Sequence, residues 1–114
     1  EFVIHAVGSD NQVIGLVSTL PPGPASGAGI QGFISSPPTA AGQRLGFYTL
    51  GVRTSSNYNP VAIQAFSEEA FTLGSAQGTA LTFSTTPTGS ATRVETVRIA
   101  GSGKVGIGVT SPVA

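Results

Sequence analysis

Apolar and polar residues alternate in short stretches along the chain. In Leu81–Thr85 (LTFST) and Glu95–Ala100 (ETVRIA), large apolar residues occupy alternate positions. A period of two places these side chains on one face of a β-strand. Glycine and proline interrupt most other segments, because the 114 residues include 16 Gly and 8 Pro, and this spacing leaves little room for helices. The pattern therefore predicts an all-β domain of short strands joined by tight turns.

The expected strands, with hairpin turns at Thr86–Ser90 and Ala100–Gly103, are Phe2–Val7, Gln12–Leu20, Gly29–Ile34, Arg44–Arg53, Pro60–Ser67, Ala80–Thr85, Glu95–Ala100 and Lys104–Val109. Val61–Leu73 is the longest window that lacks both Gly and Pro, and its apolar spacing suits a helix or a strand. Because strands are expected on both sides of it, we interpret it as a strand to Ser67, followed by a turn through Glu68 and Glu69.

The last expected strand has an unusual composition. Its apolar residues share one face, and glycines occupy the other, in the order Val105, Gly106, Ile107, Gly108, Val109. Glycine weakens a strand because it costs backbone entropy and offers no side chain for packing. A face without side chains would, however, let backbones approach closely where three chains wrap around one axis. We therefore predict that this strand lies at the axis of a homotrimer.

Charged residues are scarce, at 9% of the chain against roughly 25% in an average soluble domain. The net charge is zero and the mean hydropathy is positive, at +0.25. A soluble monomer usually keeps a mixed charged surface and a net charge away from zero. We expect part of this surface to be covered by other copies of the chain. The alternative is a monomeric β-domain with a surface rich in Ser and Thr.

The same composition argues against several function classes. The five basic residues are scattered and form no stripe that could replace phosphate counterions, so we expect no nucleic-acid binding. No run of 18 apolar residues occurs, so we expect no membrane insertion. The start of the chain lacks Met and the build of a signal peptide. We interpret the chain as a piece of a longer protein.

Residues suited to catalysis or cofactor binding are also few. The chain has no cysteine and a single histidine, His5. Glu68 and Glu69 are adjacent, so on a strand they would point to opposite faces and could not act as an acid–base pair. Two glycine patterns of the dinucleotide-binding type lack the helix that this motif requires. We expect no enzymatic activity, no cofactor and no metal site.

A polar loop, SSNYNP, is the one candidate for ligand contact. Aromatic rings stack on sugars and amides bond to sugar hydroxyls, which makes a receptor or glycan contact conceivable for Tyr48, Arg53, Asn57, Tyr58 and Asn59. The simpler interpretation, which we prefer, is that Tyr48 packs in the sheet and that Asn57–Pro60 forms an ordinary turn. A stand-alone carbohydrate-binding β-sandwich, similar to a lectin, is therefore the alternative function.

The C-terminal part of the chain resembles a known family. Leu81–Pro112 (LTFSTTPTGSATRVETVRIAGSGKVGIGVTSP) is similar to a segment found in bacteriophage tail fibres and tailspikes, just before an intramolecular chaperone domain of the endosialidase type. Upstream, Gly32–Pro37 and Ala62–Ala65 resemble the preceding part of that module. The similarity covers Ile30 to Pro112 and is most specific over Phe83–Pro87 and Arg98–Pro112. Val109 stands where threonine is usual, which is a conservative β-branched exchange.

This resemblance implies a β-rich module of a viral tail fibre, intertwined as a homotrimer with a prism-like or sandwich-like architecture. It implies an extracellular location on the virion, and attachment to a glycan or protein on the host cell surface. The self-cleaving serine of the chaperone domain is not in this sequence, so no protease activity is carried over. We expect residues 1–28 to form an N-terminal strand segment with a Pro-rich connector, and residues 29–114 to form the fibre module.

Overall fold

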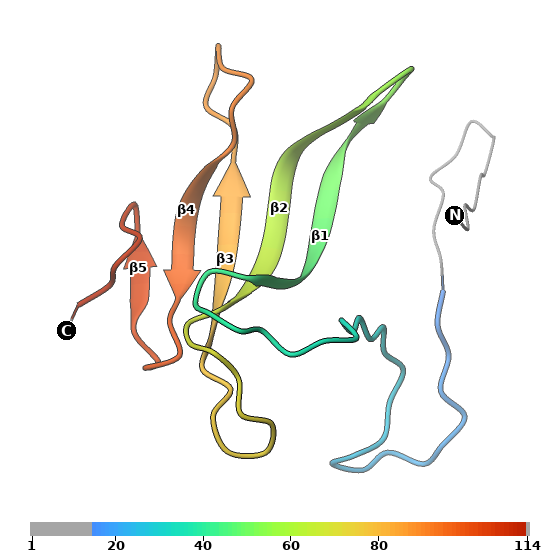
Figure 1. Cartoon of the computed structure of the whole chain (residues 1–114). Coiled ribbons are helices and arrows are strands. Elements are labelled where there is room, and N and C mark those ends of the chain that lie inside the picture. The colour runs from blue at the N-terminus through green and yellow to red at the C-terminus, as the bar shows by residue number, and fades with distance from the viewer. Residues whose placement is uncertain (1–14, 114) are drawn as a thin grey trace. The chain divides into compact units, whose positions relative to one another are not determined.

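The computed structural model describes residues 15–113 and contains one antiparallel β-sheet (Figure 1). The order in the sheet is β1-β2-β3-β4-β5, so each strand pairs with its neighbour in the sequence. The strands are β1 (Arg44–Arg53), β2 (Asn57–Ser67), β3 (Thr79–Thr85), β4 (Val94–Ile99) and β5 (Val105–Ile107). No helix occurs between residues 15 and 113, so the prediction of an all-β fold is confirmed for this part of the chain.

Several local predictions are confirmed. β1 has the predicted bounds, and the ambiguous Val61–Leu73 window is a strand that ends at Ser67, with bends at Glu68 and Glu69. Both predicted hairpin turns form, and each uses a glycine in the left-handed region, with φ of 80° at Gly89 and 83° at Gly103. These positions need glycine because other L-residues pay a steric cost there.

Two expected strands are wrong in the described part of the chain. Gly29–Ile34 and residues 15–20 of the expected Gln12–Leu20 strand are not paired with any strand, and Phe2–Val7 lies outside the described residues. An extended segment becomes a strand only when a neighbour accepts its backbone hydrogen bonds. The prolines and glycines around Pro21–Gly32 remove donors and favour turns instead. The contact pattern divides the chain into residues 1–31 and 32–114.

β2 begins at Asn57 and not at Pro60, which corrects the expected turn over Asn57–Pro60. The register passes from Leu50↔Val61 to Val52↔Tyr58, so the extra residue lies in β2, in a bulge opposite Gly51. Proline lacks a backbone N–H, and a bulge is one of the few places where a paired strand accepts it. The strand therefore continues through Pro60, and the hairpin turn lies at residues 54–56.

The sheet lacks a hydrophobic core of the usual kind. Among the described residues, the only buried hydrophobic side chains are Ala62 and Ala80, with exposures of 1% and 2%. The largest fully buried side chain is a polar one, Thr82. A single layer of strands cannot bury large apolar side chains unless a second layer covers it. The two faces of this sheet differ in composition and in exposure.

Candidate functional site

One face of the sheet carries two continuous rows of apolar residues. Paired residues of antiparallel strands point to the same face, so the register defines each row. The first row crosses all five strands as Tyr48, Ile63, Phe83, Val97 and Ile107. The second row runs beside it as Gly46, Ala65, Leu81, Ile99 and Val105. We call this surface the apolar face; neither row contains a polar or charged residue apart from the hydroxyl of Tyr48.

The apolar face is open. Ile63 and Leu81, on the central strands, are 41% and 39% exposed, and Ile107 at the edge is 79% exposed. If a side chain hides about 60–120 Å² when it is fully buried, the six most exposed residues of the two rows leave roughly 200–400 Å² of apolar surface uncovered. Each partner in a standard protein interface contributes roughly 800 Å². These two rows alone would therefore supply roughly a quarter to a half of one partner's share of such an interface.

The opposite face is more polar, and it is closed at its centre, although Phe47 at its edge is exposed. Its row runs as Phe47, Gln64, Thr82, Arg98 and Gly106, and the next row pairs Ala62 with Ser84 and Glu95. Here Gln64 and Thr82 are buried, with exposures of 7% and 1%. The hydroxyl of Thr82 donates a 3.4 Å hydrogen bond to the backbone oxygen of Gln64. Small side chains on this face are thus covered by their own neighbours.

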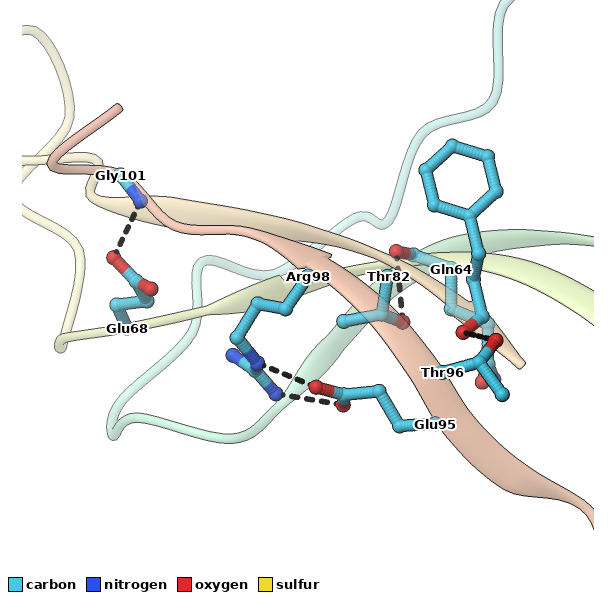
Figure 2. Close-up of polar contacts among 8 residues, drawn as sticks. Gln64, Glu68, Thr82, Glu95, Thr96, Arg98 and Gly101 are labelled. Atoms are coloured by element: carbon cyan, nitrogen blue, oxygen red, sulfur yellow. Dashed lines mark hydrogen bonds and ion pairs between the residues drawn. The ribbon is translucent and has the colours of Figure 1, made fainter. Parts of the chain in front are cut away.

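An ion pair covers part of this polar face (Figure 2). The Arg98 Nε and Nη2 groups donate to the two carboxylate oxygens of Glu95, at 2.7 and 2.9 Å. This two-point hydrogen bond raises the pKa of the Arg98 guanidinium above its usual value, although partial burial opposes the shift. Thr96 donates to the backbone oxygen of Phe83 at 3.0 Å. As predicted, Arg98 lies on the face opposite Val97 and Ile99, but Thr96 is the extra residue of a bulge in β4, and this bulge brings Glu95 onto the same face as Arg98.

The C-terminal strand is shorter than expected, and contacts within the same chain explain its glycines. β5 ends at Ile107, because Gly108 turns the chain with φ of 73° and donates a backbone hydrogen bond to Thr96 at 2.8 Å. Gly106 is buried: a Cβ there would lie 2.9 Å from the backbone oxygen of Val109 and 3.0 Å from Pro112 Cβ. The bare position at Gly106 is therefore filled by the chain's own C-terminal segment.

The five residues singled out for ligand contact divide into two groups. Asn57, Tyr58 and Asn59 line one hollow between the β1–β2 hairpin and the β3–β4 connection. Tyr48 does not line it, because this residue sits in the apolar row opposite Ile63, so the preferred interpretation of Tyr48 as a sheet residue agrees with its register position. Arg53 pairs with Asn57 at the hairpin end and does not line the hollow.

The other side of this hollow is formed by residues that no sequence pattern indicated. Thr86 and Ser90 line it together with Val52, Pro60 and Ala91. Thr86 follows β3, yet its hydroxyl donates to the backbone oxygen of Pro60 at 2.9 Å, across 26 positions of sequence. Only the β2–β3 register brings these segments together, so no local pattern in the sequence could have indicated the contact.

Comparisons with known proteins assign no function to these surfaces. No family model matches the chain, and no curated protein matches it. The geometry of the two faces and of the hollow therefore carries the functional argument, together with the sequence resemblance described above.

Proposed function

We propose that the chain is a structural and attachment module of a bacteriophage tail fibre that works as a homotrimer on the virion surface. The observation that carries this proposal is the apolar face: two rows without a charged residue cross the sheet uncovered, while the polar face is closed. A soluble domain that acted alone would have the reverse arrangement. Three sheets that turn their apolar faces toward a common axis would bury these rows.

The partner that best fits the apolar face is another copy of the same chain. Only 9% of the residues are charged, so the chain has few charges to keep a monomer with an open apolar face dispersed. Homo-oligomers with closed symmetry bury equivalent patches of every subunit, which suits a face that is uniform across five strands. The resemblance of Leu81–Pro112 to tail-fibre segments supports three copies and an extracellular location.

The alternative function, a stand-alone lectin-like β-sandwich, requires a second sheet packed on the first. Residues 15–113 form one sheet only, with an open apolar face. A sandwich built from a single chain thus has no second layer in the described part. Carbohydrate contact is better considered as a property of the hollow at the hairpin ends than as a separate fold.

Light scattering tests the assembly. A homotrimer has three times the chain mass of 11.4 kDa, about 34 kDa. Ile107→Lys places a charge at the most exposed position of the first row, on the short edge strand, where it disturbs the fold of one chain least. We expect this variant to lose the trimer, and Ser102→Lys, in the exposed β4–β5 turn, to keep it. A wild-type monomer or dimer would contradict the proposal, as would an Ile107→Lys trimer.

A further inference from the structure

β1 is an open edge of the sheet. Figure 1 shows it as the outermost strand on its side, and within residues 15–113 no segment pairs with its outer border. In an antiparallel pair, every second residue points its backbone N–H and C=O groups away from the partner strand. β1 is ten residues long, so it offers a row of such groups to a further strand. An edge of this kind is a template for strand addition.

The other free borders of the sheet are short or capped by side chains. Where β2 extends beyond β3, Thr86 donates to the backbone oxygen of Pro60, and Arg93 Nη1 donates to that of Asn59 at 2.8 Å. β5, at the opposite edge, has only three residues. β1 has no proline, carries charges only at its two ends, and keeps a regular register over residues 46–50. Its central part therefore lacks the features that usually protect an edge strand.

Positive charges mark both ends of β1. Arg44 and Arg53 are exposed, and the one ion pair in the described part of the chain involves neither of them. A strand that matched them would be ten residues long, with a carboxylate at each end. The first ten residues of the sequence have this pattern, because Glu1 and Asp10 flank the predicted strand Phe2–Val7. The chain has three other acidic residues, and each already accepts a hydrogen bond within the same chain: Glu68, Glu69 and Glu95.

The antiparallel orientation of such a strand matches polarity as well as charge. With its end charges paired, an antiparallel strand places Ile4 and Ala6 next to the apolar face and His5 on the more polar face. A parallel strand with its end charges paired would instead place His5 opposite Tyr48, on the apolar face. The antiparallel pairs are Glu1↔Arg53, Ile4↔Leu50, His5↔Thr49, Ala6↔Tyr48 and Asp10↔Arg44.

We propose that residues 1–10 of a neighbouring copy add to the β1 edge as an antiparallel strand. The backbone groups of β1 bind the added strand, and the charges at both ends set its register. Residues 1–10 lie outside Ile30–Pro112, the part of the chain that carries the family resemblance. The proposal requires a second copy and in that sense rests on the assembly proposed above. It uses the edge of the sheet, however, and leaves the apolar face free for packing between sheets.

Engineered cysteines test this register, because the chain has none of its own. Facing residues of antiparallel strands have Cα atoms about 4.5–5.5 Å apart, which is within the span of a disulfide. We expect a refolded mixture of His5→Cys chains and Thr49→Cys chains to form a disulfide between positions 5 and 49 on oxidation. In this mixture any such bond joins two chains. Trypsin cleaves after Arg44 and separates the two positions, so mass spectrometry of the linked peptides identifies the bond.

A mixture of Ala6→Cys chains and Thr49→Cys chains is the matched control. Adjacent residues of a strand point to opposite faces, so the yield of this disulfide should be at least about fivefold lower. Arg44→Glu, placed in the Thr49→Cys chain, should lower the yield of the bond between positions 5 and 49 about two- to fivefold at low salt. Asp10→Arg in the His5→Cys chain should restore this yield, because it exchanges the two charges.

Three results would overturn the proposal: equal yields from the two mixtures, a disulfide that forms only when both cysteines are in one chain, or a yield that Arg44→Glu leaves unchanged. Light scattering on the same samples separates this failure from failure of the proposed assembly. A trimer without a selective disulfide would keep the assembly and refute strand addition. A monomer without one would refute both, whereas a dimer with the selective disulfide would support strand addition and refute the trimer.

Discussion

Gly106 provides a direct test of how the C-terminal segment packs. Replacement by alanine adds one methyl group to a position where there is no space. The new Cβ would lie 2.7 Å from Val109 Cγ2, 2.9 Å from the Val109 backbone oxygen and 3.0 Å from Pro112 Cβ. The valine methyl could rotate away. The backbone oxygen and the proline ring could separate from the new methyl only if the segment after Gly108 moved as a unit.

The expected cost follows from these contacts. Extra methyl groups in a well-packed site usually destabilise a protein by about 1–3 kcal/mol. Since two of the three contacts involve rigid groups, we expect about 2 kcal/mol, which lowers the melting temperature of a domain of this size by roughly 10 °C. Gly46→Ala is the matched control, because Gly46 lies in β1 with no atom within 4 Å of its Cβ position and without a positive φ. It should be neutral, or stabilising by about 0.5–1 kcal/mol.

Thermal unfolding at a fixed chain concentration measures both variants, and light scattering reports the assembly of each. Equal melting temperatures for Gly106→Ala and Gly46→Ala would refute the packing of Val109 and Pro112 on Gly106. Loss of the trimer, with unchanged unfolding of the separate chain, would instead favour close approach of neighbouring chains at the Gly106 side of the predicted axis strand. The two explanations for this glycine thus give different results in the same pair of measurements.

Two further predictions concern polar groups of the sheet. The Ser67 hydroxyl, in a residue that is 2% exposed, donates to the Ala40 backbone oxygen at 2.8 Å and accepts from the Gln43 N–H at 3.0 Å. Ser67→Ala should therefore lower the free energy of unfolding in urea by about 1–2 kcal/mol. An unchanged urea midpoint would contradict this role. Glu95→Gln removes the negative charge of a partly exposed ion pair and should lower the free energy of unfolding by about 1 kcal/mol or less. High salt should reduce this difference in stability from the wild type. A loss of stability that does not depend on salt would contradict an electrostatic role and point to side-chain packing.

The alternation of residues predicted the sheet well where both strands of a pair lie close in sequence. The bounds of β1 and the glycines of both turns follow from local chemistry, because a turn that needs positive φ selects glycine. The sharing of one face by Leu81, Phe83, Val97 and Ile99 also follows from a period of two. These features need no knowledge of the rest of the chain.

Features that depend on distant partners could not be predicted in the same way. Gly29–Ile34 has the composition of a short strand, but its sequence alone does not show that no neighbouring strand pairs with it. The sequence pattern predicted that a strand starts at Pro60. The bulge that accommodates this proline inside β2 arises only from the β1–β2 register, so the pattern of β2 alone could not indicate it. For the same reason, the sequence indicated only one side of the hollow. Residues 57–59 are contiguous in the sequence, whereas strand pairing brings Thr86 and Ser90 next to them.

The two faces of the sheet together explain why the chain combines few charges with a positive mean hydropathy. On the polar face, Thr82 and Gln64 are buried under their own neighbours, so that face has little further area to offer. On the apolar face, the large side chains of five strands lie open, and no strand or loop of residues 32–113 contributes a buried apolar layer over them. Hydrophobic burial is the main stabilising term in folding, and the exposed side chains of the apolar face contribute little to it until another layer covers them. The sheet is therefore half of a packed structure, and the layer that completes it must come from outside these residues.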